Sequence, residues 1–124
     1  LVLDNCKIQP RFQHKLIEAP AQSPWKHGLL DMEEPKGRAM ILNLSPTTTR
    51  AFIYLVDDAT TFEQVRLSYD LGQGEGLQTV TDEAFPWEFT LPLDASVSEL
   101  RFSISGTNKQ GQTVSYETYQ LSKD

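Results

Sequence analysis

Aromatic side chains are the residues of this chain best suited to bind a ligand. Trp and Tyr rings stack on the apolar faces of sugar rings, while neighbouring Asn, Gln and Asp side chains hydrogen-bond the hydroxyls. Trp25 lies in a polar stretch bounded by prolines, and Tyr119 lies on the strand face opposite Tyr116. Trp87 shares its strand parity with apolar neighbours, which favours a place in the core. Trp25 and Tyr119 are therefore the candidate ligand-binding residues.

Adjacent acidic residues occur at Asp57-Asp58 and Asp82-Glu83. A retaining glycosidase needs two carboxyl groups about 5 Å apart on facing elements, and neighbours within one turn do not supply that arrangement. Calcium takes several oxygen ligands from loops, and the loops that hold Asp57, Asp58 and Asp94 can lie near one end of a sandwich. No Asp-x-Asp-x-Asp loop occurs, so we predict no metal centre, with these three residues as the only calcium candidates.

The histidines and the cysteine match no catalytic or metal-binding pattern. His14 and His27 are thirteen residues apart with prolines between them, which fits no metal-ligand spacing, and no Gly-x-Ser-x-Gly elbow supplies a nucleophile. Cys6 is the single cysteine, so an internal disulfide is excluded. Leu3 precedes it at the spacing of a bacterial lipoprotein cleavage site, but Asn5 stands where a small residue is needed, so lipidation and a free thiol both stay open. We expect no enzyme activity and no cofactor.

Length and charge exclude other classes of function. A chain of 124 residues is long enough for one domain with a single core. The net charge is −6, and residues 51–124 carry twelve acidic side chains against four basic ones, so nucleic-acid binding is not expected. The longest apolar run, Phe52 to Val56, is far shorter than the roughly 20 residues of a membrane span. The start at Leu1, without a methionine, favours a piece of a longer exported protein.

Alternation of apolar and polar residues recurs from residue 39 onward and predicts an all-β fold. Turn-forming clusters such as Gly72–Gly76 separate the apolar runs. About seven strands are predicted, which suits an antiparallel sandwich: 39–45, 50–56, 64–69, 77–80, 87–93, 99–105 and 113–121. By parity, the predicted core includes Met40, Leu42, Leu44, Leu100, Phe102 and Ile104.

The first third of the chain is predicted to differ from the rest. Prolines at positions 10, 20, 24 and 35 forbid a long regular element, so we expect an N-terminal edge strand, from extended pieces at 1–8 and 12–17, and then an irregular wrap. Ala51–Val56 is apolar on both faces, and this wrap is the candidate to cover it. The expected organisation is an extension at 1–36 and a sandwich at 37–124, together one folding unit.

Three stretches resemble immunoglobulin-like and fibronectin type III-like modules of bacterial secreted and surface proteins. They are Phe62-Glu-Gln-Val-Arg-Leu-Ser-Tyr-Asp70, Trp87-Glu-Phe-Thr-Leu-Pro-Leu-Asp94 and Leu100-Arg-Phe-Ser-Ile-Ser-Gly-Thr-Asn-Lys-Gln-Gly111. The third departs from the usual pattern, with Thr107-Asn108 in place of an acid and Gln112 in place of an Asn. The resemblance implies an immunoglobulin-like antiparallel β-sandwich, an architecture that serves many unrelated functions.

Two functions remain after these exclusions. The first is a non-catalytic protein-interaction or spacer module of an exported bacterial protein, at the cell surface or in the periplasm. Its partner is expected to pair with the final strand, through Tyr116, Thr118 and Leu121, or with the N-terminal strand. The alternative is a carbohydrate-binding accessory domain of a glycan-processing enzyme. Exposure of Trp25 and a tyrosine in one line would favour that alternative.

Overall fold

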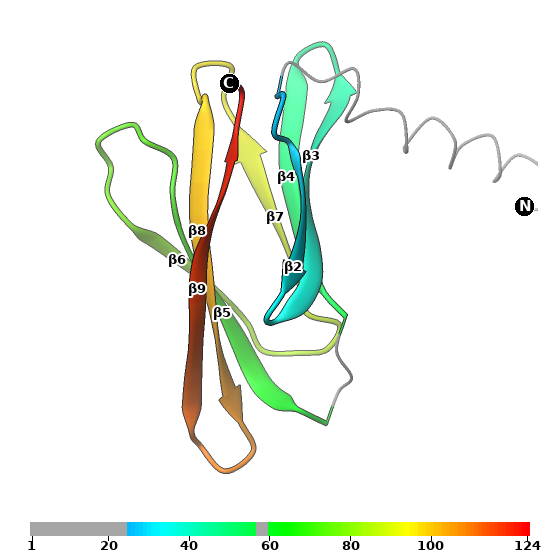
Figure 1. Ribbon diagram of the computed structural model, residues 1–124, viewed down its shortest axis with the longest axis vertical. Helices are drawn as coiled ribbons and strands as arrows, with labels where there is room; N and C mark the ends of the chain where they lie inside the picture. The colour runs from blue at the N-terminus through cyan, green and yellow to red at the C-terminus, as the bar shows by residue number, and fades with distance from the viewer. Residues whose placement is uncertain (1–24, 57–59) are drawn as a thin grey trace, which may run out of the picture.

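The computed structural model describes residues 25–56 and 60–124, which form eight β-strands (Figure 1). The described residues contain no helix, and thus no helix long and apolar enough to span a membrane. The strands are β2 (Leu29–Glu33), β3 (Lys36–Ser45), β4 (Thr48–Leu55), β5 (Phe62–Asp70), β6 (Gln78–Asp82), β7 (Glu88–Leu93), β8 (Glu99–Asn108) and β9 (Thr113–Ser122).

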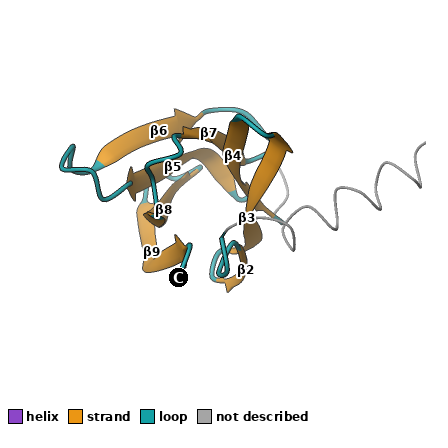
Figure 2. Ribbon diagram, turned by 90° about the horizontal axis from the view of Figure 1, so that it is seen from above, coloured by secondary structure: helices purple, strands orange, loops and turns teal. Residues whose placement is uncertain are grey.

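The strands make two antiparallel four-stranded sheets, in the orders β2-β3-β4-β7 and β6-β5-β8-β9. Seen from above, β6 lies near β7 on one side of the sandwich, and β9 lies opposite β2 on the other (Figure 2). The all-β sandwich predicted from the sequence is confirmed, and each of the seven predicted strands is present. The eighth strand, β2, falls within the segment predicted to be an irregular wrap.

The core lies between the two sheets, and sequence alternation locates most of it. Leu100, Phe102 and Ile104 are all buried, as predicted. The parity prediction for β3 was wrong, because Ala39 and Ile41 are the buried residues of that strand. Both faces of β3 are apolar, so alternation does not decide between them. The register with β4 determines which face turns inward: Ala39 pairs with Ile53 and Ile41 pairs with Ala51, and both partners are buried. Met40 and Leu42 are left half-buried on the outer face, and Leu44 is exposed.

The described part of the predicted extension forms an edge strand that pairs with β3. Met32 of β2 is buried, and Pro35 lies buried in the turn that follows. The outer face of the β2-β3-β4-β7 sheet carries Phe52 and Tyr54, half-buried, with ring centroids 5.7 Å apart. The extended pieces expected at 1–8 and 12–17, together with Cys6 and His14, lie outside the described residues.

Residues 25–28 link the two sheets at one end of the sandwich. The backbone of His27 exchanges two hydrogen bonds with Ser122 of β9, at 2.9 and 3.1 Å. The carbonyl of Gly28 accepts a hydrogen bond from the amide of Ile41 in β3, at 2.8 Å. A single short segment therefore bonds to strands of both sheets, which ties the open side between β2 and β9.

Candidate functional site

Trp25 is a core residue rather than an exposed platform. Its side chain is 3% exposed and belongs to the main hydrophobic cluster. The ammonium of Lys123 lies 5.8 Å from the centre of its ring, and the sheet-linking segment 25–28 holds its backbone in place. An indole so enclosed presents no open face to a sugar. An exposed Trp25 in line with a tyrosine would have favoured a glycan site there. The burial of Trp25 excludes that arrangement.

Tyr119 and Tyr116 lie on the same face of the sheet, although regular alternation placed them on opposite faces. The register of β8 and β9 shifts between Ser103 and Ser105, so β9 contains an extra residue there. Both tyrosines pack against the core, and the Tyr119 hydroxyl donates a hydrogen bond to the carbonyl of Glu34, at 3.0 Å. Tyr119 therefore bridges β9 and the β2–β3 turn.

The remaining predicted site residues are dispersed. Leu121 is buried, whereas Thr118 is exposed on β9, the edge strand of its sheet. Asp57 and Asp58 lie outside the described residues. Asp94 directly follows Leu93, the last residue of β7. Leu93 pairs with Thr49 near the start of β4, so Asp94 and Leu55 lie at opposite ends of this sheet. No group of three or more potential metal-ligating side chains is found in residues 25–56 and 60–124.

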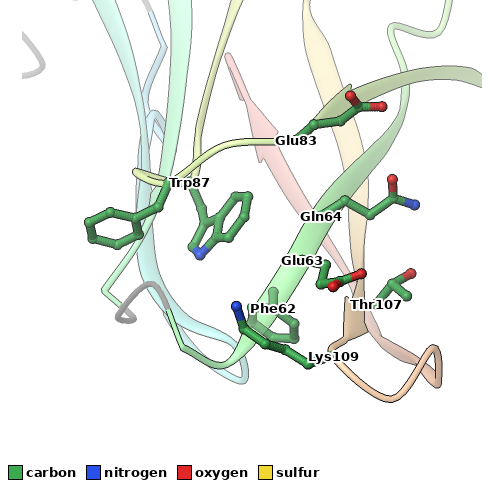
Figure 3. Close-up of a pocket in the computed structure, with 8 residues that line it drawn as sticks. Phe62, Glu63, Gln64, Glu83, Trp87, Thr107 and Lys109 are labelled. Atoms are coloured by element: carbon green, nitrogen blue, oxygen red, sulfur yellow. The ribbon is translucent and has the colours of Figure 1, made fainter.

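A different set of residues lines a cleft of about 660 Å³ at the end of the sandwich (Figure 3). Three segments far apart in the sequence contribute: the start of β5, the β6–β7 connection, and the end of β8 with its turn. We call this site the Phe85 cleft. Its lining residues are Phe62, Glu63, Gln64, Glu83, Phe85, Trp87, Thr107 and Lys109.

Strand pairing explains why a cleft opens here. β6 pairs with β5 only from Val65 onward, so the first three residues of β5 extend beyond it. The chain then leaves β6 at Asp82 and crosses to β7 in the other sheet. Glu63 is an extra residue in the pairing of β5 with β8, and such a bulge redirects the neighbouring side chains. Phe62 is thereby turned inward, against Gly106.

An aromatic cluster forms one wall of the Phe85 cleft. The Trp87 ring lies edge-to-face with Phe62, at a centroid distance of 6.4 Å and an interplanar angle of 81°. It makes a similar contact with Phe85, at 6.2 Å and 82°. Phe62 and Trp87 are buried, whereas Phe85 is 48% exposed. The cleft therefore offers the half-exposed ring of Phe85, which packs against Trp87, and Trp87 in turn packs against Phe62.

Hydrogen bonds within the neighbouring loops hold the polar residues of the cleft. Asp82 accepts hydrogen bonds from the amides of Ala84 and Glu88, at 3.2 and 3.1 Å, so one carboxylate braces both ends of the connection that carries Glu83. Asn108 accepts hydrogen bonds from the amides of Gln110 and Gln112, at 3.0 and 2.9 Å. These bonds shape the turn that presents Lys109.

The Trp87 indole leaves one hydrogen-bond donor unused. Its Nε1 atom is buried and has no hydrogen-bond partner among residues 25–56 and 60–124. The nitrogen is directed toward Phe62 and Lys109 (Figure 3). An unpaired buried donor costs about 1–3 kcal/mol, so its retention at the edge of a cleft needs an explanation. A ligand oxygen would supply the missing acceptor.

Sequence reasoning missed most of this site. The cleft draws on segments 62–64, 83–87 and 107–109, and no motif spacing connects them. Trp87 was assigned to the core, which is confirmed by its 2% exposure, but it also lines the cleft. One signal was available: Phe85 is a large aromatic residue in a polar connection, next to a proline, where core packing does not require one.

Comparisons with known proteins identify the fold and no family. No family model matches the chain, and no curated protein matches its sequence. Among solved structures it is similar to a Br derivative of BhCBM56, a carbohydrate-binding module, with a TM-score of 0.52, 18% identity, and coverage of 77% of this chain and 98% of that one. It also matches a polysaccharide deacetylase from Bacillus cereus, with a TM-score of 0.49 and 17% identity over 70% of this chain and 30% of that one. At 18% identity, the likeness to BhCBM56 shows a shared β-sandwich.

Proposed function

We propose that this chain is a non-catalytic carbohydrate-binding module that holds a glycan in the Phe85 cleft. The observation that carries the proposal is the half-exposed Phe85 ring, which packs edge-to-face on Trp87 in a cleft that polar side chains also line. Gln64, Thr107 and Lys109 offer donors and acceptors for sugar hydroxyls. The volume of about 660 Å³ falls within the range of small-ligand sites.

The shared fold supports this proposal without deciding it. BhCBM56 is a carbohydrate-binding module and is covered over nearly its whole length by this chain. β-Sandwiches serve many functions, however, so the proposed glycan binding rests on the residues of the Phe85 cleft. A module of this kind would belong to an exported glycan-processing enzyme, at the cell surface or in the periplasm.

The composition of the cleft favours binding over catalysis. Among the described residues, its lining contains no histidine, cysteine or serine, the groups that most often act as base or nucleophile. Its two carboxylates, Glu63 and Glu83, are both exposed, whereas a catalytic acid is usually tuned by burial in an apolar site.

Replacement of Phe85 by alanine is expected to weaken glycan binding about tenfold, because a ring contact worth about 1.5 kcal/mol is lost. The fold should be retained, since the ring is half-exposed. Affinity electrophoresis of the full chain against soluble β-glucan, xylan, chitosan and starch identifies the ligand, and calorimetry measures the change. Phe52→Ala, on the outer face of the other sheet, is the matched control and should bind normally. Failure of the full chain to bind any of these polysaccharides, or equal loss in both variants, would overturn the proposal.

Protein interaction remains a second candidate, favoured by one observation. β9 is an edge strand paired only with β8 in its sheet, and exposed Thr118 lies on it. An edge strand can add a strand from another protein. The buried Leu121 is unavailable for such a contact, so a partner would engage the backbone and the exposed side chains around Thr118.

A further inference from the structure

The Phe85 cleft carries more negative than positive charge. Glu63 and Glu83 supply two carboxylates, and Lys109 supplies one ammonium group. All three side chains are exposed. Arg38 and Asp31 form an ion pair elsewhere in the protein. Among the described residues, Glu63, Glu83 and Lys109 form no ion pair. Both carboxylates are therefore free to accept hydrogen bonds from a ligand.

The two carboxylates reach the cleft from different segments. Glu83 comes from the β6–β7 connection, and Glu63 comes from the bulge at the start of β5 (Figure 3). The same two segments supply the aromatic cluster: Phe85 and Trp87 come from the β6–β7 connection, and Phe62 comes from the start of β5. Each segment therefore contributes both an aromatic ring and a carboxylate to the lining of the cleft.

The unused Nε1 donor of Trp87 is a second and independent observation at the same place. The side chain is 2% exposed, and its nitrogen lacks an acceptor. Hydroxyl oxygens of a sugar accept hydrogen bonds from such donors. The cleft therefore combines a donor that needs an oxygen, free carboxylates that suit a cation, and a ring for an apolar sugar face.

We infer that the Phe85 cleft prefers glycans that carry protonated amino groups, such as glucosamine polymers, over neutral or N-acetylated glycans of equal length. The inference rests on the proposed function and names the ligand class of the same site. The ammonium group of the sugar donates hydrogen bonds to Glu63 and Glu83. Lys109 repels the same group but is outnumbered two to one. Acidic glycans are expected to bind less tightly, because Glu63 and Glu83 repel their negative charges.

The test compares three hexasaccharides: of glucosamine, of N-acetylglucosamine, and of glucose joined by the same β-1,4 linkage. Calorimetry is performed with the full chain at slightly acidic pH, where the sugar amine is protonated, in low and in high salt. Exposed charge pairs are weak, so the expected preference for the glucosamine ligand is about three- to tenfold. Added salt should reduce this preference, because it screens exposed charges.

Variants assign the preference to individual groups. Glu63→Gln combined with Glu83→Gln should equalise the three affinities, and Glu117→Gln, an exposed charge on β9, should leave the preference intact. Trp87→Phe removes the Nε1 donor together with part of the buried indole ring, and should weaken all three ligands by the same factor.

The possible failures are distinguishable. Equal affinities of the full chain for the three ligands would overturn the inference and leave the proposed function standing. A preference that survives the double variant, or that Glu117→Gln also abolishes, would likewise overturn it. If none of the three ligands or the polysaccharides binds, the proposed function fails as well.

Discussion

Deletion of residues 1–36 is expected to leave a chain that no longer unfolds cooperatively. The deletion removes β2 and two buried core residues, Trp25 and Met32. It also removes the backbone hydrogen bonds from residues 26–28 to β9 and β3, which tie the two sheets together. A loss of this size exceeds the marginal stability of a small domain.

Thermal unfolding followed by circular dichroism measures this effect. A chain that lacks only residues 1–24 is the control, and it should still melt in one transition because β2 and Trp25 are retained. An unchanged melting temperature after removal of residues 1–36 would contradict the account. The segment before residue 37 would then contribute nothing to the sandwich.

Replacement of Trp25 by alanine is expected to lower the free energy of unfolding by about 3–5 kcal/mol, as for other large aromatic residues in cores. The indole is 3% exposed, so the substitution creates a cavity where residues 25–28 join the sheets. Urea unfolding measures the loss. The half-exposed Phe85 provides the comparison, since Phe85→Ala should cost much less stability.

The same pair of variants separates structure from binding. The fraction of Trp25→Ala that remains folded should retain normal glycan affinity, whereas Phe85→Ala should lose affinity and keep its stability. The reverse outcome, a stable Trp25→Ala chain that binds no glycan, would restore Trp25 as the ligand platform suggested by its sequence context.

Alternation predicted the strands well wherever only one face of a strand is apolar. In β8, Phe102 alternates with polar residues, and it is buried as expected. In β3 the pattern is ambiguous, because Ala39 and Met40 are both apolar. The register with β4 places the smaller residue, Ala39, in the core. Small residues suit an inner face that must also hold Trp25 and Trp87. Such a choice depends on partners that are distant in the sequence.

The candidate site could not be read from the sequence for two physical reasons. Bulges in β5 and β9 change which side chains share a face, and alternation cannot reveal an extra residue. Tyr119 was placed on the wrong face for this reason, and the inward turn of Phe62 was missed. The cleft itself is assembled from loops, and only the pairing of the strands brings Phe85 near Lys109.

The most direct test of the account is a nuclear magnetic resonance titration of the ¹⁵N-labelled chain with the tightest glycan of the panel. Glycan binding in the Phe85 cleft predicts that the largest shift changes fall on amides of residues 62–64, 83–87 and 107–109, and on the Nε1 proton of Trp87. Largest changes at Phe52 and Tyr54 on the outer face, or at Thr118 on β9, would contradict it and place the ligand elsewhere.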